Sequence, residues 1–322
     1  MTAFRNARPF LKWAGGKRQL LPVLRRFYPV RFSTYYEPFL GSGAVFFDLC
    51  AAGLLDDRSV LLTDINPDVV GCYLAVRDDL DGVISELHAL AQGHAARGAT
   101  HYYEIREERF NPWRRELFAS AASASDAKPV PYPAALAAML IYLNRTGYNG
   151  LFRLNRQGAF NVPVGRYANP TICDADTLRA VSFALNRPGV ELAHASFDVV
   201  ASRAAADAFV YFDPPYAPLT PTSRFTSYTR DGFDDVAQAR LQRLILALAR
   251  QGCHVLLSNS TAPSIRALYD DNTEASEAGL RAFRVPARRA INSNARKRRP
   301  IGEYVVTNIP KRRTLAARRQ SV

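Results

Sequence analysis

Cysteine, histidine and long apolar runs are all scarce in this chain of 322 residues. The four cysteines, Cys50, Cys72, Cys173 and Cys253, lie far apart without a C-x-x-C pair, which argues against a disulfide framework or a zinc site. The five histidines are scattered, so we expect no metal. The longest apolar run, residues 134–143, has ten residues, well short of the roughly 18 that a membrane-spanning helix needs.

The first residues, MTAFRNARPFLKWAGGK, lack the apolar segment of a secretory signal. A chain with free cysteines, no signal and no membrane span is typical of the cytoplasm, and we predict that location.

Acidic residues are nearly absent from the C-terminal part of the chain. Residues 281–322 contain 13 lysines and arginines and one acid, Glu303, whereas residues 1–280 have a net charge of only +1. This asymmetry indicates a polyanionic partner such as nucleic acid. We expect the arginine-rich residues 288–299 to form a loop that contacts phosphates, and residues 311–322 to form a flexible basic tail.

Short apolar segments alternate with helical patterns, which predicts an α/β fold with a mostly parallel sheet. The predicted strands are residues 35–39, 60–63, 210–212, 254–258 and 304–309. The clearest predicted helices are residues 46–52 and 237–250, the second ending before Gly252. The alternation stops between about residues 70 and 180, where a helical stretch precedes a Gly/Asn/Arg/Tyr-rich hairpin. We therefore predict a discontinuous catalytic domain (1–69 and 180–310) with an insert at 70–179.

A glycine-containing turn, EPFLGSG, follows the first predicted strand. Gly41 and Gly43 allow the backbone to approach a ligand closely, and Asp64 at the tip of the second strand is suited to accept hydrogen bonds from ribose hydroxyls. Phe46 replaces the third glycine of G-x-G-x-x-G, which favours a nucleoside ligand without a pyrophosphate. A tight turn followed by a helix-capping Asp64 remains the alternative.

The sequence Asp213-Pro214-Pro215-Tyr216 follows a third apolar strand and is a more specific signal. The prolines fix an extended turn at a strand tip, where open α/β sheets bind ligands. The turn offers a carboxylate, a carbonyl of set direction and an aromatic face, which suit a planar base with an exocyclic amine.

Near the N-terminus, FLKWAGGK combines lysines with a Gly-Gly turn and Trp13. Lysines beside such a turn suit an anionic group and Trp13 offers a stacking surface, but the spacing of a phosphate-binding P-loop is absent.

Together, FLKWAGGK, EPFLGSG, TDIN and DPPYAPL resemble the Dam-like family of DNA N6-adenine methyltransferases, in the family's order and from about Pro9 to Asn308. The resemblance implies a Rossmann-like methyltransferase domain with an inserted helical and β-hairpin DNA-recognition domain. It implies S-adenosylmethionine as cofactor and double-stranded DNA as partner, with GATC as the methylated site. It leaves open whether a cognate restriction nuclease accompanies the enzyme.

The resemblance also implies residue roles. The cofactor contacts are Trp13, Lys17, Gly41, Gly43, Asp64 and Asp213. The DNA contacts are Lys12, Tyr148, Asn149, Leu151 and Arg153, with Arg153 reading guanine. The catalytic residues are Asp213, Pro214 and Tyr216.

In the predicted reaction, Asp213 and the Pro214 carbonyl accept hydrogen bonds from the N6 amine of a flipped adenine, and Tyr216 stacks on the base. Methylation of RNA adenine is one alternative, although A-form RNA has too narrow a major groove for the hairpin. A non-catalytic DNA-binding regulator is another, which the intact DPPY and Asp64 oppose. A nicotinamide dehydrogenase fits poorly because the third glycine is missing.

Overall fold

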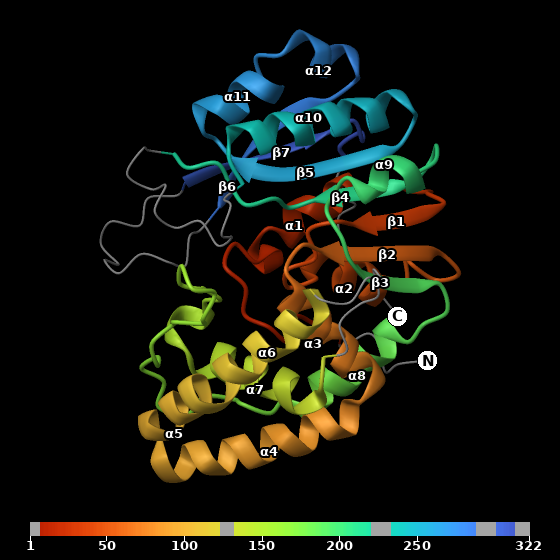
Figure 1. Cartoon of the computed structure of the whole chain (residues 1–322). Coiled ribbons are helices and arrows are strands. Elements are labelled where there is room, and N and C mark those ends of the chain that lie inside the picture. The colour runs from red at the N-terminus through yellow and green to blue at the C-terminus, as the bar shows by residue number, and fades with distance from the viewer. Residues whose placement is uncertain (1–6, 123–131, 220–232, 288–300, 313–322) are drawn as a thin grey trace, which may run out of the picture.

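A seven-stranded sheet forms the centre of the molecule in this computed structural model, which describes residues 7–122, 132–219, 233–287 and 301–312 (Figure 1). The strands are β1 (Thr34–Glu37), β2 (Ser59–Asp64), β3 (Val190–His194), β4 (Phe209–Phe212), β5 (His254–Ser260), β6 (Arg281–Ala287) and β7 (Ile301–Thr307). Their order is β3-β2-β1-β4-β5-β7-β6; β7 runs antiparallel to both neighbours and the other pairs are parallel.

Helices cover both faces of the sheet and extend beyond one end of it. The helices of four residues or more are α1 (Leu21–Leu24), α2 (Ala44–Ala51), α3 (Pro67–Asp78), α4 (Leu80–Arg97), α5 (Ala99–Glu104), the π-helix η4 (Ile105–Phe110), α6 (Asn111–Ala122), α7 (Ala134–Thr146), α8 (Ala175–Leu185), α9 (Val199–Arg203), α10 (Asp235–Arg250), α11 (Pro263–Tyr269) and α12 (Thr273–Glu277). The described residues also form three short 3₁₀ turns, η2 (Lys17–Gln19), η3 (Arg25–Phe27) and η5 (Tyr148–Gly150).

Strand alternation builds two separate cores. In β4, Phe209 and Tyr211 face the core shared with α2, α3 and α7, whereas Val210 and Phe212 face the core shared with α9 and α10. All four side chains are buried, as expected for a central strand covered on both faces.

Helix α10 shows how local sequence sets an element. The Asp234 side chain caps its N-terminus by accepting from the Ala237 amide at 2.8 Å, and the chain leaves the helix at Gly252, whose φ is +89°. Leu241, Ile245 and Leu248 form its buried stripe.

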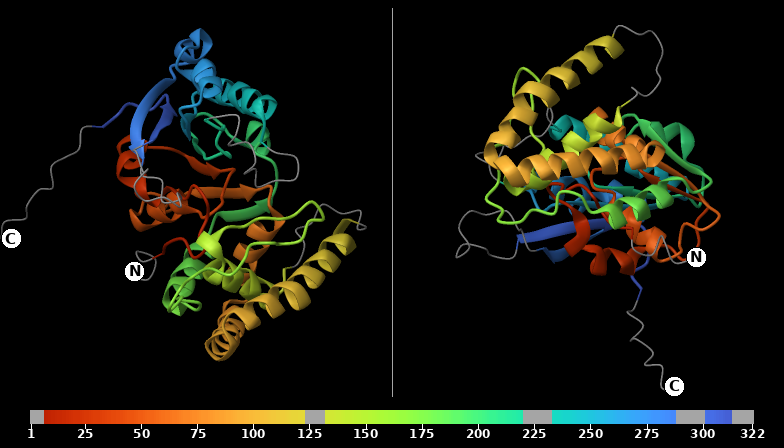
Figure 2. Two further views of the ribbon diagram at one scale, coloured as in Figure 1. Left: turned by 90° about the vertical axis from the view of Figure 1, so that its left-hand side faces the viewer. Right: turned by 90° about the horizontal axis from the view of Figure 1, so that it is seen from below.

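A helical region lies at one end of the molecule and the β6–β7 edge with α11 and α12 lies at the other (Figures 1 and 2). Within the helical region α4 and α3 both pack against α7. The predicted domain boundaries at residues 70 and 179 fall inside α3 and α8, so the domain division stays a prediction.

The predicted hairpin has antiparallel pairing without regular strands. Isolated bridges join Gly147 to Val164 and Leu154 to Phe160. The Asn155 amide donates to the Ala159 carbonyl at 2.8 Å, which closes the tip. We call residues 151–165 the hairpin segment.

The five predicted strands are confirmed within a few residues, and helices 46–52 and 237–250 correspond to α2 and α10. Two strands, β3 and β6, were not predicted from the sequence. The whole arginine-rich segment 288–299 and residues 313–322 of the basic tail lie outside the described residues, so their predicted roles stay predictions. Within the described ranges, no helix is long and apolar enough to cross a membrane.

Candidate active site

The glycine turn, Asp64 and the DPPY turn stand at the carboxyl ends of β1, β2 and β4, respectively. The chain runs from β1 outward through β2 to β3 on one side, and β4 begins the other half of the sheet beside β1. Open α/β sheets bind ligands at such a reversal of strand order, outside the carboxyl ends of the strands.

Asp64 organises the glycine turn. Its carboxylate accepts from the Gly41 amide at 2.9 Å and from the Asn66 amide at 2.9 Å. The predicted alternative, in which Asp64 caps the next helix, is wrong, because the Asn66 side chain caps α3 by accepting from the amide of Asp68 at 3.0 Å. Burial raises the pKa of Asp64, while the two amide donors act in the opposite direction.

Gly41 and Gly43 both adopt positive φ angles, 46° and 63°. A Cβ atom on Gly41 would lie 2.9 Å from Trp13 Cδ1, so the backbone reaches the indole only because position 41 lacks a side chain. Trp13 stacks on Phe152 of the hairpin segment with ring centroids 5.8 Å apart. The N-terminal segment, the glycine turn and the hairpin segment therefore converge at this indole.

Lys17, Asp213 and Tyr216 form one cluster. Lys17 Nζ lies 2.7 Å from Asp213 Oδ1, an ion pair whose angles fall short of hydrogen-bond alignment, and 4.6 Å from the centre of the Tyr216 ring. Lys17 Nζ also donates to the Gly15 carbonyl. Only 5% of the Lys17 side chain is exposed, against 20% for Asp213, so the carboxylate keeps the better access to solvent and to a ligand.

Desolvation raises the pKa of Asp213 to about 6. The Lys17 ammonium lowers this pKa, and the Glu303 carboxylate raises it. Asp213 therefore becomes a carboxylate just below neutral pH, where it can accept hydrogen bonds.

Buried polar side chains fix the backbone of the DPPY turn. Gln238 on α10 donates to the Pro215 carbonyl at 2.9 Å and in turn accepts from Asn259 Nδ2 at 3.0 Å. Asn259 Oδ1 accepts from the Ala217 amide at 3.3 Å, and the Tyr216 hydroxyl donates to Glu303 at 3.0 Å. The C-terminal half of the turn is thus anchored to α10, β5 and β7.

Our sequence analysis missed these supporting residues. Gln238 and Gln242 lie in the buried stripe of α10. Side-chain amides on an otherwise apolar helix face could have indicated buried hydrogen bonds. Asn259 and Ser260 end β5 as buried polar residues.

Glu37, at the end of β1, is a further buried acid near the site. Its Oε2 accepts from the Tyr35 hydroxyl at 2.7 Å and from the Phe46 amide at 2.9 Å. Burial raises the pKa of Glu37 to about 8, and the nearby Asp213 carboxylate adds to the rise. Glu37 thus ties β1 to the first turn of α2, beside the glycine turn.

Lys12 lies between the N-terminal segment and the end of α7. Asn144 accepts from the Lys12 amide at 2.7 Å and donates to the Lys12 carbonyl at 2.8 Å. Lys12 Nζ donates to the Arg145 carbonyl at 3.1 Å and lies 4.1 Å from the centre of the Tyr167 ring. Burial and the adjacent Arg145 lower the pKa of Lys12.

The predicted DNA-contacting residues of the insert sit on an exposed turn and the arm that follows it. Tyr148 is 44% exposed, and Asn149 adopts a left-handed φ of 54°, a strained conformation for a residue with a Cβ. Leu151 is half-buried. The Arg153 side chain is exposed; its Nε donates to Asn161 Oδ1 at 2.7 Å and its Nη2 to the Asn161 carbonyl at 3.2 Å, which uses two of the five N–H groups of the guanidinium.

The mostly parallel sheet, whose strand order reverses between β1 and β4, defines a Rossmann-like α/β fold. The D12 class N6 adenine-specific DNA methyltransferase family matches residues 13–283. The chain belongs to this family and is therefore an adenine-specific DNA methyltransferase.

Individual relatives align over nearly the whole chain. Type II methyltransferase M.MjaIII of Methanocaldococcus jannaschii is 37% identical, covering 94% of this chain and 99% of that protein. Type II methyltransferase M1.LlaDCHI of Lactococcus lactis subsp. cremoris is 33% identical, with 94% and 96% covered. The DNA adenine methylase of Escherichia coli K12 is 34% identical, with 94% and 96% covered.

Proposed function

We propose that this enzyme transfers a methyl group from S-adenosylmethionine to N6 of an adenine flipped out of duplex DNA, within GATC. The observation that carries the proposal is the Lys17–Asp213–Tyr216 cluster beside the Gly41–Asp64 contact. These groups supply a cofactor acid, a hydrogen-bond acceptor and an aromatic face at the carboxyl ends of β2 and β4.

The residues of the glycine turn fit the cofactor. Asp64 uses one lone pair of each oxygen for the Gly41 and Asn66 amides and retains others for ribose hydroxyls. The absence of a Cβ at Gly41 lets the Trp13 indole pack directly against the glycine turn. We assign Trp13, Lys17, Gly41, Gly43, Asp64 and Asp213 to cofactor binding.

When bound, S-adenosylmethionine supplies the electrophilic methyl group. The amine of adenine is a weak nucleophile because its lone pair is delocalised into the ring. Asp213 and the Pro214 carbonyl accept hydrogen bonds from the two N6–H groups, which aims the lone pair at the methyl group. The Asp213 carboxylate also stabilises the positive charge that develops on N6.

The target base must leave the helix because an adenine within a duplex cannot reach the site. Tyr216 offers a ring for stacking, and Glu303 fixes its hydroxyl. We assign Tyr148, Asn149 and Leu151 to filling the vacated space, Lys12 to the edge of the site and Arg153 to guanine. The exposure of Tyr148 and Arg153 supports these roles.

The test is transfer of tritium from labelled S-adenosylmethionine to a GATC duplex, to the same duplex with one base pair changed, and to the RNA of the same sequence. We expect rapid transfer to the GATC duplex alone. Equal transfer to RNA would favour the RNA alternative, and equal transfer to all duplexes would remove the GATC assignment.

Relatives named type II methyltransferases and relatives named DNA adenine methylases both align over 94% of the chain. The relatives therefore do not decide whether a cognate restriction nuclease accompanies this enzyme, and the nuclease stays a separate prediction. We predict that the enzyme acts in the cytoplasm. The measurement is cleavage, by an extract of the source organism, of unmethylated but not of methylated target DNA.

A further inference from the structure

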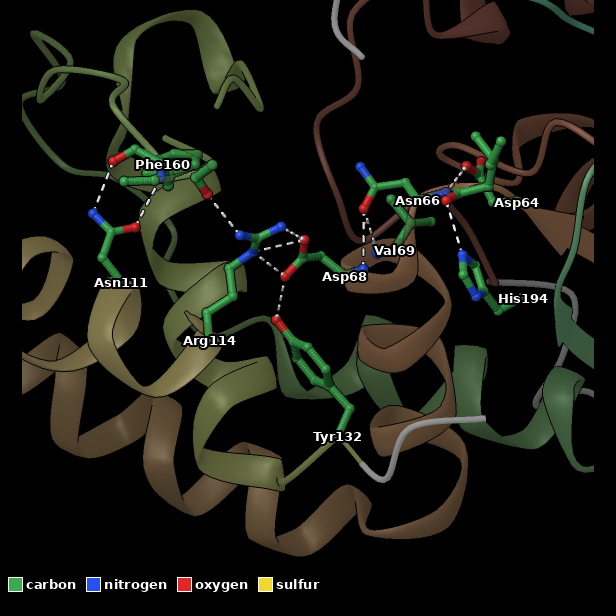
Figure 3. A network of polar contacts seen from close by, with 12 residues as sticks. Asp64, Asn66, Asp68, Val69, Asn111, Arg114, Tyr132, Phe160 and His194 are labelled. Carbon is green, nitrogen blue, oxygen red and sulfur yellow. Dashed lines mark hydrogen bonds and ion pairs between the residues drawn. The ribbon is translucent and has the colours of Figure 1, made fainter. Parts of the chain in front are cut away.

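A fully buried carboxylate lies on the first turn of α3, four residues after the proposed cofactor acid Asp64 (Figure 3). Asp68 is 0% exposed. Arg114 Nε lies 2.8 Å from both of its oxygens, Arg114 Nη2 lies 2.7 Å from Oδ2, and the Tyr132 hydroxyl donates to Oδ1 at 3.1 Å. A bidentate pair of this kind fixes the plane of the guanidinium as well as its position.

The opposite edge of the same guanidinium reaches the hairpin segment. Arg114 Nη1 donates to the Gly158 carbonyl at 2.7 Å. Gly158 belongs to the tip, where Asn155 Oδ1 accepts from the amides of Gln157 and Ala159 at 3.0 and 2.9 Å. Arg114 therefore holds a tip that is already ordered by its own hydrogen bonds.

The other end of this contact chain is the proposed cofactor site. The Asp68 amide donates to Asn66 Oδ1 at 3.0 Å, and the Asn66 amide donates to Asp64 Oδ1 at 2.9 Å. Figure 3 shows these side chains in one row, from Asp64 through Asn66 and Asp68 to Arg114. One continuous series of polar contacts thus joins the glycine turn to the hairpin tip.

We propose that Arg114 is a positioning residue for base recognition: it fixes the hairpin segment on α3, and so sets where Arg153 lies relative to the reacting adenine. The inference rests on the proposed role of the hairpin segment in reading DNA. Arg153 is five residues before Gly158, and its carbonyl accepts from the Asn161 amide at 3.1 Å, so tip and reading arm form one unit. A shift of about 1 Å in such a unit can cost up to about 100-fold in rate.

Arg114→Lys is the informative variant because it keeps a charge for the ion pair with Asp68 but removes the hydrogen bond to the Gly158 carbonyl. A lysine retains a positive charge for the buried Asp68, which avoids the cost of an unpaired buried carboxylate. A single ammonium nitrogen cannot replace Nε and Nη2 on Asp68 and Nη1 on Gly158, which lie on opposite edges of the guanidinium. The double variant Asp68→Asn/Arg114→Gln removes both charges together and serves as a second variant if the lysine is poorly accommodated.

The matched control is Tyr132→Phe. It removes a hydrogen bond from the same carboxylate but leaves the contact between Arg114 and Gly158 intact. A role of this cluster in stability alone would affect the control and the test variant alike.

Two measurements on the full-length enzyme test the proposal. In amide hydrogen exchange, Arg114→Lys should speed exchange of the Gln157 and Ala159 amides about tenfold, with no such change in Tyr132→Phe. In kinetics on GATC and its single-base variants, Arg114→Lys should lower the preference of kcat/KM for guanine at the position read by Arg153 about tenfold, while affinity for S-adenosylmethionine stays within about twofold.

The proposal would be overturned if the Gln157 and Ala159 amides exchanged at the wild-type rate in both Arg114→Lys and the double variant. It would also be overturned if these amides exchanged faster while the preference for guanine stayed at the wild-type level. An equal loss in Tyr132→Phe would also overturn it, since the effect would then come from stability. Failure of the proposed function is a different result, in which the wild type itself methylates all duplexes alike.

Discussion

The pH dependence of methyl transfer should shift in opposite directions when the two charged neighbours of Asp213 are removed one at a time. In the proposed mechanism Asp213 accepts hydrogen bonds from the amine as a carboxylate, and its pKa is about 6. For the wild type, kcat/KM should therefore fall tenfold per pH unit below about pH 6 and level off above it.

The Lys17 ammonium, 2.7 Å from Asp213 Oδ1, lowers the pKa of this carboxyl. Lys17→Met removes the ammonium, so the pKa of Asp213 should rise. An opposite charge at this distance shifts a carboxyl pKa by about 1–3 units. A rise of about 2 units would take the ionised fraction at pH 7 from about nine tenths to about one tenth, so the acid limb should move toward pH 8. Glu303→Gln removes a carboxylate that raises the pKa of Asp213, so the limb should move below pH 6.

The assay is kcat/KM for tritium transfer from pH 5 to pH 9.5, normalised to each enzyme's own plateau because Lys17 is also a proposed cofactor contact. Lys17→Arg, which keeps the charge, is the control and should retain a limb near pH 6. Glu303→Gln keeps an acceptor for the Tyr216 hydroxyl, so only charge changes. If the two variants shift the limb in the same direction, or leave it in place, the assignment of the limb to Asp213 is refuted.

Three further predictions concern single residues. Asp213→Ala should abolish transfer while the fold stays largely intact, because the prolines and the Gln238 contact still hold the turn; near-wild-type turnover would contradict its role. Arg153→Ala should lower discrimination at one base pair by about 1–3 kcal/mol, roughly 5- to 150-fold, in kcat/KM on GATC and its single-base variants; an equal loss on every duplex would indicate a phosphate contact instead. Glu37, whose folded pKa of about 8 lies above its ordinary value, stays protonated in the folded protein while the unfolded chain is ionised, so its contribution to stability decreases as pH rises from about 4.5 to about 8. Glu37→Gln should reduce that loss, about 1.4 kcal/mol per pH unit at most, in urea unfolding at pH 5, 6.5 and 8; the same slope as wild type would assign the pH dependence to other groups.

Local backbone chemistry explains what could be predicted from the sequence. The glycines of the glycine turn and the prolines of the DPPY turn have distinctive backbone conformations, so both turns could be predicted from residue type. Asp64 could be predicted because it ends the second strand at a typical spacing from Gly43. The fold brings Lys17 beside Asp213 although 196 residues of sequence separate them. Their grouping in one site was predicted from the family resemblance, because sequence spacing alone could not indicate it.

The supporting contacts could not be predicted, because they join distant parts of the chain. The Tyr216–Glu303 hydrogen bond spans 87 positions and the Arg114–Asp68 pair spans 46. The missed strands β3 and β6 are the two edges of the sheet, where one side is unpaired and the apolar pattern weakens. β3 is only partly buried, and β6 contains Pro286, a residue that sequence rules assign to edges or loops.

The measurement that most directly tests the central claim is the mapping of modified adenines in DNA from a host without methyltransferases of its own that expresses this chain. Our account predicts N6-methyladenine at GATC on both strands, and none in the same host expressing Asp213→Ala. Unmodified adenines throughout the DNA of a host that produces the folded wild-type protein would contradict the account.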